Sequence, residues 1–437
     1  MLRPALAAAC RAALAALVLA AAALAAVLGA ILWDMHQARR AWRATGSGAS
    51  FSRDGDVCRT ADPAMVAQSF PCRKPPLEFR VFVIGSSQAM GTPYVHQDLN
   101  AAADLFFRMP NEGGLSTWLR EYLQRLMPRK SVRVINAAKG AGDFGVSVET
   151  MREVVESGQA DIVLVLEGNN ERPSGDIAGP GIQGIVDGIG RRLRKRLDDL
   201  ARLAESGRLP TYILTVPNNL RAWMPQTDGP RAEVSARIAL AGRGIRWTQG
   251  RRRPDDPLDW FLLGCTWEAA RDFPAARKAF LRAKDLDRSF FRMRSSWNDE
   301  IRRTRGRQTR VIDMERILFG YAKDGIPGSD LFLDYCHLTL TGNRLVAFEV
   351  AKRLQADLDL GGGPLALEDA PLSPFLSGQQ RRLRRLYLAK KAKWLVSRLL
   401  SARTPVDAVN FGEQAELYAR HADMLAKQVK LARQSPR

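Results

Sequence analysis

Short apolar runs alternate with amphipathic stretches through most of this chain of 437 residues. The apolar runs are rich in β-favouring residues and predict buried strands at 80–85, 132–136, 161–166, 211–216 and 309–313. Elsewhere apolar residues recur at helical spacing, which predicts helices at about 114–127, 147–157, 181–206 and 340–354. This alternation is typical of an α/β fold in which a parallel sheet carries helices on both faces. We expect that domain to occupy residues 78–221 and to resume at 308–360.

Four segments lie outside that alternation. Residues 12–33 are an uncharged run of mostly Ala, Leu and Val, and a helix needs about 20 such residues to cross a bilayer. Residues 34–77 are rich in Gly, Ser, Asp and Pro with little periodicity, so we expect a polar stalk or lead-in. Residues 222–307 form a mostly helical insertion. Residues 376–437 form a helical tail, packed on the protein or at a membrane surface, with helices at about 377–402 and 412–433.

The first segment and two cysteines indicate the compartment. The apolar core of a signal peptide is usually only about 7–15 residues, so residues 12–33 favour an uncleaved transmembrane anchor over a cleaved signal peptide. Cys58 and Cys72 follow the anchor at a separation that allows a disulfide, which would require an oxidising compartment, while two free thiols are the alternative. We therefore expect a single-pass membrane protein with its catalytic domain on the extracytoplasmic side, periplasmic or extracellular.

Small and polar residues follow three of the predicted strands. The first strand ends in Gly85-Ser86-Ser87, the second continues into 136–142, and the third into 168–171. Ligands of parallel sheets bind at the carboxyl ends of the strands, so these three loops would line one crevice.

Together with Asp334-Tyr335-Cys336-His337, these loops resemble, in chain order, the four sequence blocks of SGNH (GDSL-type) hydrolases. The resemblance covers roughly residues 78–353. The family's Gly-x-Ser-x-x-x-Gly falls on Gly85, Ser87 and Gly91. Its Gly-x-Asn-Asp falls on Gly168, Asn170 and Glu171, with Glu in place of Asp, and its Asp-x-x-His falls on Asp334 and His337.

The resemblance implies a serine esterase with a catalytic triad of Ser87 as nucleophile, His337 as base and Asp334 as the group that orients it. The oxyanion hole would combine the backbone N–H of Ser87, the side-chain amide of Asn170 and one backbone N–H from Gly140, Gly142 or Ala141. Ser86 competes with Ser87 as nucleophile, but only Ser87 has the family spacing.

The inventory of histidines supports the same base. Acyl transfer at a serine needs a group that accepts its proton. The chain has four histidines, of which His36 adjoins the apolar run, His421 is in the tail and His96 belongs to none of the four blocks. His337 is therefore the best candidate. No metal-ligand cluster and no dinucleotide glycine motif is present, so we expect no metal and no cofactor.

The net charge and the helical insertion indicate what the chain could bind. The net charge of +20 reflects solvated helix faces or an anionic neighbour, either a lipid surface or an acidic polymer; no nucleic-acid motif accompanies it. Trp260-x-x-Leu263-Gly264-x-x-Trp267 resembles the start of a tetratricopeptide repeat over about 257–288, a possible protein-binding unit, with a plain helical hairpin as the alternative.

These features lead us to expect a membrane-anchored SGNH-type serine ester hydrolase that acts, through an acyl-enzyme, on an O-acyl ester of an extracytoplasmic glycan or lipid. One alternative is an O-acyltransferase that modifies a polysaccharide with the same triad, in which arginines at 251–253 and 302–310 would hold an anionic acceptor. The other is a non-catalytic scaffold that binds a partner through the helical repeat.

Overall fold

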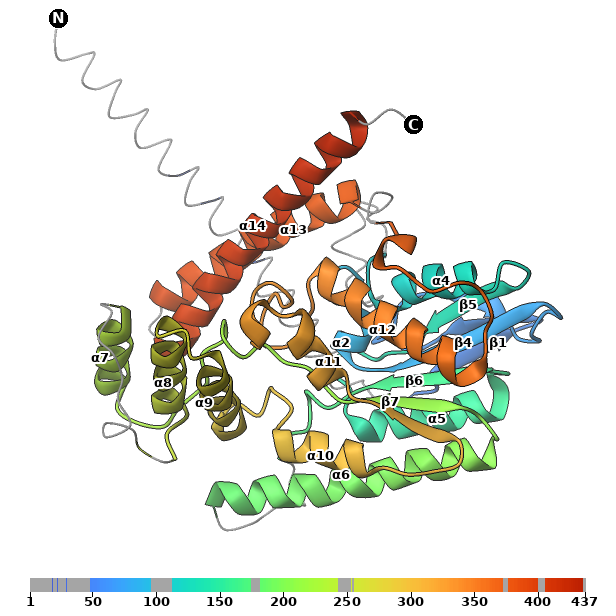
Figure 1. The fold of residues 1–437 in the computed structure, drawn as a ribbon, viewed down its shortest axis with the longest axis horizontal. Helices are drawn as coiled ribbons and strands as arrows, with labels where there is room; N and C mark the ends of the chain where they lie inside the picture. Colours follow the sequence, from blue (N-terminus) through green and yellow to red (C-terminus); the bar gives the residue numbers. More distant parts are fainter. Residues whose placement is uncertain are drawn as a thin grey trace, which may run out of the picture.

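The computed structural model describes residues 48–95, 112–173, 181–242, 253, 255–371, 376–399 and 405–434, with the single residues 18, 22 and 29 (Figure 1). The expected transmembrane segment, residues 12–33, lies outside these residues apart from those three. Within the described part of the chain, no helix combines the length and the apolar character needed to cross a membrane.

A parallel five-stranded sheet forms the centre of the molecule, and all five predicted strands contribute to it. Its order is β5-β4-β6-β7-β8, a doubly wound arrangement in which every neighbouring pair is parallel. Every residue of β4 and β6 is buried. This explains the apolar runs at 81–84 and 162–166, while the two charged residues at the start of β4, Glu78 and Arg80, pair with each other at 2.6 Å. The strands are β4 (Glu78–Gly85), β5 (Ser131–Asn136), β6 (Ile162–Leu166), β7 (Thr211–Leu214) and β8 (Thr309–Ile312).

Helices cover both faces of this sheet, which confirms the predicted α/β fold. Figure 1 shows α4 (Leu115–Leu126) and α12 (Leu340–Leu358) on one face, and α5 (Phe144–Ser157), α6 (Gly181–Ser206) and α10 (Ser295–Arg303) on the other. Shorter elements connect them: α2 (Ser87–Met90), α11 (Met314–Tyr321), η3 (Lys323–Gly325) and η4 (Leu367–Asp369).

Strand register brings the carboxyl ends of β4 and β6 to the same level. Gly85 pairs with Leu166, the last residue of β6, and Asn136 at the end of β5 pairs with Val83. The loops that follow these three strands therefore leave the sheet at one edge, as the sequence predicted.

The segment expected to be a polar stalk is instead folded from residue 48 onward. It forms an antiparallel sheet of β1 (Phe51–Asp54), β2 (Val57–Thr60) and β3 (Ser69–Pro71). Phe51 and Phe70 pack edge-on against each other and against Phe82 of β4, with ring centroids 5.8 Å apart. The prediction was wrong because strands of three or four residues are too short to show a period. The predicted Cys58–Cys72 disulfide is present and is confirmed.

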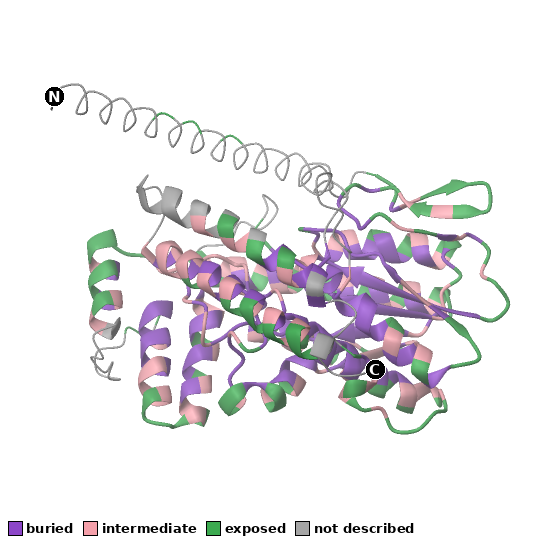
Figure 2. Ribbon diagram, turned by 90° about the horizontal axis from the view of Figure 1, so that it is seen from above, coloured by how far each residue is buried: buried purple, intermediate pink, exposed green. Residues whose placement is uncertain are grey.

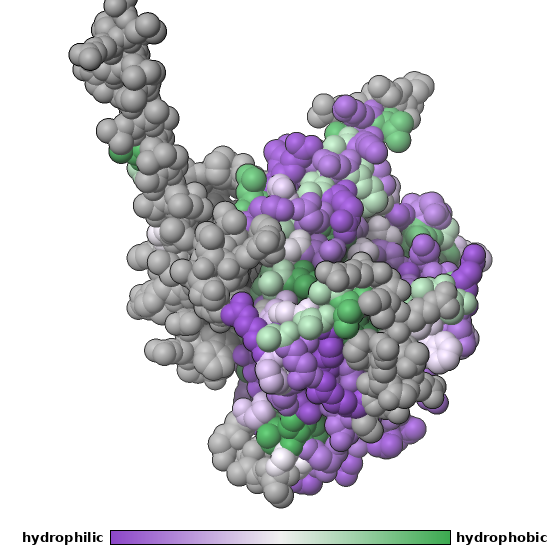
Figure 3. All heavy atoms as spheres, turned by 90° about the vertical axis from the view of Figure 1, so that its left-hand side faces the viewer, coloured by the Kyte–Doolittle hydropathy of each residue, from purple (hydrophilic) through white to green (hydrophobic). Residues whose placement is uncertain are grey.

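The predicted insertion divides into two parts. Its helices α7 (Arg231–Gly242), α8 (Pro257–Ala269) and α9 (Phe273–Leu286) lie beside the α/β domain, and Figure 3 shows hydrophobic patches separated by hydrophilic side chains on that side. The hairpin α8–α9 is close-packed, because a Cβ on Gly264 would lie 2.7 Å from the ring of Phe280. In contrast, α10 belongs to the main core: Trp297 is buried there and its Nε1 donates to the carbonyl of Val186 at 3.2 Å. The insertion therefore ends before α10, not at residue 307, and the tetratricopeptide-like assignment stays a prediction.

The tail folds back onto the domain. It consists of α13 (Leu376–Leu399) and α14 (Pro405–Gln434), which lie side by side (Figure 1). Leu417, Tyr418 and Leu425 of α14 are buried in the main core, and Figure 2 shows buried residues continuing from the sheet into this region. The second tail helix is thus a packed element and starts seven residues earlier than predicted (405 against 412).

Candidate active site

Three residues far apart in sequence meet at the carboxyl edge of the sheet. Ser87 Oγ lies 2.8 Å from His337 Nε2, and His337 Nδ1 lies 2.7 Å from Asp334 Oδ2. In the tautomer with the proton on Nδ1, the imidazole donates to the carboxylate and accepts from the hydroxyl. Asp334 is buried, while His337 and Ser87 are partly exposed. The arrangement has the connectivity of a Ser-His-Asp triad.

Two glycines shape the turn that presents Ser87. Gly85 has a φ of +148°, and a Cβ there would lie 2.0 Å from the carbonyl oxygen of Leu166. Gly91 has a φ of +93°, and its Cβ would meet the backbone of Gly114 at 2.3 Å. Both positions therefore require glycine, which is the physical basis of the Gly-x-Ser-x-x-x-Gly spacing.

Ser86 faces a different environment from Ser87. It is buried, and its side chain is hydrogen-bonded to Glu167, which directly precedes Gly168. Burial raises the pKa of Glu167 well above its usual range, and the charge of Glu171 adds to this, although the N–H of Gly168 donates to Glu167 at 2.8 Å and opposes it. The structure thus places Ser87, not Ser86, against the imidazole.

The loop before α12 fixes the other two residues. A bridge between Phe332 and Leu338 closes it, and the N–H of Leu333 donates to the carbonyl of His337 at 2.7 Å. Asp334 Oδ1 accepts from the backbone N–H groups of Cys336 at 3.0 Å and His337 at 2.8 Å. Both hydrogen bonds to Oδ1 therefore come from the loop to which Asp334 itself belongs.

The Asp334 carboxylate is stabilised as an anion. Burial alone would raise its pKa, but the attraction of His337 and the hydrogen bonds from the His337 side chain and from two backbone N–H groups lower the pKa of Asp334 below its usual value. It therefore carries a negative charge at neutral pH, which suits a group that orients an imidazole and stabilises the imidazolium.

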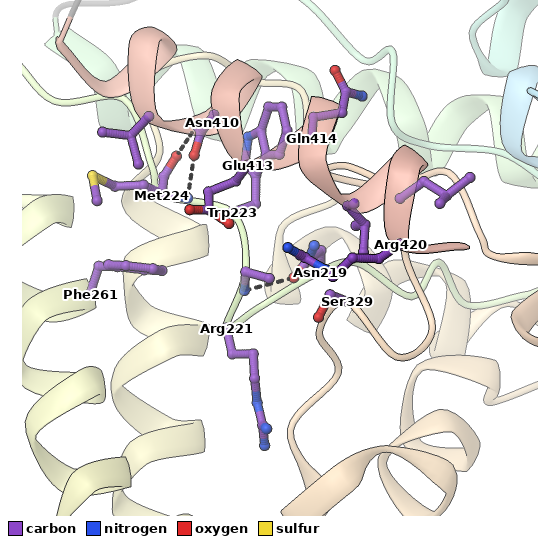
Figure 4. Close-up of a pocket in the computed structure, with 14 residues that line it drawn as sticks. Asn219, Arg221, Trp223, Met224, Phe261, Ser329, Asn410, Glu413, Gln414 and Arg420 are labelled. Carbon is purple, nitrogen blue, oxygen red and sulfur yellow. Dashed lines mark hydrogen bonds between the residues drawn. The ribbon is translucent and has the colours of Figure 1, made fainter. Parts of the chain in front are cut away.

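The tail adds a contact that sequence reasoning missed. Gln414 of α14 donates from Nε2 to Asp334 Oδ2 at 3.0 Å, and both side chains are buried. Asn410, one turn earlier, fixes α14 through two hydrogen bonds with the backbone of Met224, at 2.8 and 2.9 Å (Figure 4). A pocket of about 290 Å³ lies between α14, α8 and residues 219–224, with Gln414 in its wall. The periodicity predicted a helix here, but no local signal indicated what it would contact.

On the other side of Ser87, the 140–142 loop and Asn170 are in contact. Asn170 donates from Nδ2 to the carbonyl of Gly142 at 2.8 Å. The N–H of Gly140 donates to Ala64 at 2.9 Å, and that of Gly142 donates to Lys139 at 3.1 Å. Among the described residues, none accepts a hydrogen bond from the N–H of Ala141, whose φ is +60°. Of the three candidates for a loop donor, Ala141 is thus the one not already engaged.

The N-terminal sheet supports this loop through buried polar contacts. Lys139 pairs with Asp62 at 3.0 Å, and both side chains are only 2% exposed. Gln68 exchanges two hydrogen bonds with the backbone of Asn136, at 2.8 and 3.1 Å. The segment predicted as a stalk therefore positions one wall of the site.

Glu171, in the third of the four sequence blocks, holds the chain just after the 140–142 loop. Glu171, fully buried, accepts from the N–H of Phe144 at 2.7 Å and pairs with Arg196 at 3.2 Å. Burial, followed by the charge of Asp143, raises the pKa of Glu171. The glutamate that departs from the family pattern thus holds the start of α5, just after residues 140–142.

The remaining predicted features lie elsewhere. His421 Nε2 contacts the carbonyl of Ser329 at 3.2 Å, and His36 and His96 lie outside the described residues. In the described part of the chain, the group of side chains that could hold a metal ion is Asp334, Cys336 and His337, which shares two residues with the triad. Because the Nδ1 of His337 is engaged by Asp334, we do not propose a metal there.

The arginines expected to form an acceptor wall are placed differently from that expectation. Residues 304–308 precede β8 and lie beside the start of β7, because the N–H of Thr211 donates to the carbonyl of Gln308 at 2.8 Å. The starts of these strands form the edge of the sheet opposite the one that carries Ser87. Arg302 is paired with Asp313 and Glu315, both at 2.7 Å. Residues 251 and 252 lie outside the described chain.

No family model and no curated protein matches the chain. Solved structures with a similar arrangement include LAE5, an α/β hydrolase from the metagenome of Lake Arreo in Spain, at 14% identity and a TM-score of 0.35 over 65% of this chain and 97% of that one. A lipase/acylhydrolase from Enterococcus faecalis matches at 14% identity and 0.30 over 66% and 100%. The salicylyl-acyltransferase SsfX3 of a tetracycline biosynthetic pathway matches at 12% identity and 0.28 over 69% and 59%.

Proposed function

We propose that this chain is a serine ester hydrolase of SGNH type that works through an acyl-enzyme on Ser87. The observation that carries the proposal is the continuous hydrogen-bonded chain from Ser87 through His337 to Asp334. A hydroxyl, an imidazole and a buried carboxylate in this order are what acyl transfer at serine requires.

Each step uses an atom of the site. Ser87 Oγ attacks the acyl carbonyl while His337 Nε2 takes its proton, and the Asp334 carboxylate stabilises the imidazolium that forms. His337 then gives the proton to the departing alcohol oxygen, which leaves the acyl group esterified to Ser87. Water attacks this ester with the same base, and Ser87 is regenerated together with the free acid.

The oxyanion of each tetrahedral intermediate needs donors on the far side of Ser87 from His337. The N–H of Ser87 stands at the first turn of α2, where helical N–H groups have no partner in the helix. We assign the loop donor to Ala141, because Gly140 and Gly142 donate to other residues. Asn170 uses one amide proton on Gly142, and the second proton of the same NH₂ group is the third donor.

We infer the compartment and the class of substrate from a disulfide of the N-terminal sheet and from the apolar run at 12–33. The Cys58–Cys72 disulfide supports an extracytoplasmic location, because disulfides persist in oxidising compartments. The apolar run at 12–33 would anchor the chain to the membrane as a single span. The esters within reach of such an enzyme are O-acyl groups on extracytoplasmic glycans or lipids.

An O-acyltransferase is the second candidate, since it would use the same three residues. The observation in its favour is that Phe291, between α9 and α10, and Phe411, from the tail, belong to a cluster of rings beside His337, where an acceptor hydroxyl would bind. The fate of a labelled acetyl group separates the two: release as acetate supports hydrolysis, and transfer to an added glycan supports the transferase.

The test of the shared mechanism uses adjacent serines as a matched pair. We expect the full-length protein and its Ser86→Ala variant to be labelled by a fluorophosphonate probe and to cleave 4-nitrophenyl acetate, and Ser87→Ala to do neither. Removing a catalytic serine lowers turnover by about 10⁶-fold. Labelling that persists in Ser87→Ala would refute the site assignment.

A further inference from the structure

Four aromatic rings from four parts of the chain form a cluster beside the imidazole. The ring centroid of Tyr335 lies 5.7 Å from that of His337, and Phe291 lies 5.5 Å and Trp223 5.6 Å from Tyr335. Phe411 of the tail packs against Trp223 at 6.3 Å. Tyr335, Phe291 and Phe411 are partly exposed. The cluster is thus an accessible aromatic surface that begins at the catalytic base.

A cation borders this surface. Arg172 follows the Asn170-Glu171 pair, and its guanidinium lies over the ring of Phe291, 4.7 Å from the centroid. Its side chain is exposed and makes no ion pair with any described residue. By contrast, Arg292 next to Phe291 is buried and paired with Asp287 at 2.7 Å. Arg172 therefore remains available for an anionic group of a ligand.

The position of the cluster determines which half of an ester it can contact. In acyl transfer at serine, the acyl oxygen points to the oxyanion donors, while the base must reach the alcohol oxygen in order to protonate it. The side of the site next to His337 is therefore the side of the alcohol. The same holds for transfer, because the acceptor hydroxyl that attacks the acyl-enzyme gives its proton to the same nitrogen.

We propose that Tyr335, Phe291 and Arg172, with Trp223 packed against Tyr335, form a subsite for the alcohol half of the ester, and that this alcohol is a sugar ring bearing a carboxylate. Aromatic faces pack against the C–H faces of a pyranose, as they do against other flat, partly apolar groups. The guanidinium supplies charge-assisted hydrogen bonds to a carboxylate at the edge of the ring. The inference rests on the proposed function, since His337 defines the alcohol side only if it acts as the base.

The test measures binding of two matched alcohols to the full-length Ser87→Ala protein by ligand-observed NMR and tryptophan fluorescence. Methyl glucuronide and methyl glucoside differ by the carboxylate. We expect the glucuronide to bind about fivefold more tightly, and Arg172→Gln to remove that preference. Phe291→Leu should weaken binding of both sugars by about 2–10-fold. The control is Arg277→Gln, because Arg277 of α9 lies over the ring of Phe319 of α11 at 5.2 Å, and neither residue belongs to the aromatic cluster beside His337.

Equal binding of the two sugars, or an equal effect of Arg277→Gln and Arg172→Gln, would overturn the subsite. So would the absence of binding to either sugar. Probe labelling of the wild-type protein at Ser87 is read separately. Labelling without sugar preference rejects the subsite and keeps the esterase. Sugar preference without labelling rejects the proposed reaction and, with it, the assignment of these residues to the alcohol half of an ester.

Discussion

Replacing Gln414 by leucine tests whether the tail takes part in catalysis. The Asp334 carboxylate accepts four hydrogen bonds: two backbone N–H groups on Oδ1, and His337 Nδ1 and Gln414 Nε2 on Oδ2. A hydrogen bond to a charged group contributes about 1.5–3 kcal/mol. Since three of the four remain in Gln414→Leu, we take the low end, and 1.5 kcal/mol expressed in the transition state lowers kcat/KM by about tenfold.

The fold should survive this change. Gln414 Oε1 is buried without a hydrogen-bond partner among the described residues, so leucine also removes an unsatisfied acceptor. The assay is 4-nitrophenyl acetate hydrolysis from pH 5 to pH 9, with thermal unfolding measured in parallel.

Gln428→Leu is the matched control, since Gln428 lies in the same helix and its Oε1 also has no partner among the described residues. We expect Gln428→Leu to retain wild-type kcat/KM and pH profile. Wild-type kinetics in Gln414→Leu would refute the reasoning. An equal loss of kcat/KM in Gln414→Leu and Gln428→Leu would reduce the role of Gln414 to packing.

Three further predictions concern stability. Cys58→Ser opens a loop of sequence separation 14, so the free energy of unfolding should fall by about 3 kcal/mol, and reduction of the wild type should reproduce this in urea titrations. The pKa of Glu167 is raised in the folded protein, so the unfolded chain releases this proton at lower pH than the folded one. The free energy of unfolding should therefore fall with rising pH, by about 1.4 kcal/mol per pH unit above the usual carboxyl range. Unfolding measured at pH 5 and pH 8 should show a smaller fall in Glu167→Gln than in the wild type. Glu171→Ala leaves the backbone N–H of Phe144 without its acceptor and leaves the half-buried Arg196 paired with Asp143 alone, and should lower the free energy of unfolding by about 1–3 kcal/mol; an unchanged unfolding midpoint would contradict the assigned contacts of Glu171.

Local features explain why the sheet and the candidate triad were predictable. Strands β4 and β6 are buried throughout and each contains a continuous apolar run, at 81–84 and 162–166. The loops that follow parallel strands lie at one edge of the sheet. Gly85 and Gly91 are required by backbone geometry, which makes the spacing around Ser87 visible in sequence. The separation of Asp334 and His337 by three residues is likewise local, because one short loop sets it.

Features that depend on distant contacts were not predictable in this way. From the sequence, Lys139 is expected to be a surface lysine. Its buried partner Asp62 is placed by the short strands of the N-terminal sheet, which the sequence did not indicate. Gln414 reads as one polar position among many on a helix, and only docking of α14 gives it a partner 80 residues away. The boundary between the insertion and the main core was predicted wrongly for the same reason. Nothing in the sequence distinguishes Trp297 from the other aromatic residues of the helical segment, but in the structure it packs on α6.

Three segments, the N-terminal sheet, the tail and the chain between α9 and α10, each contact a different side of the candidate site. The N-terminal sheet holds the oxyanion side through the buried Asp62–Lys139 pair, and the tail holds the carboxylate through Gln414. The chain between α9 and α10 brings Phe291 to the alcohol side. A chain cut to residues 78–360 would keep all three triad residues and lose two of these three supports. Because a buried charge left without its partner costs about 3–5 kcal/mol, loss of Asp62 alone would disturb the loop beside Ser87. The proposed active site is therefore supported by segments at both ends of the described chain, although the four sequence blocks occupy only its middle.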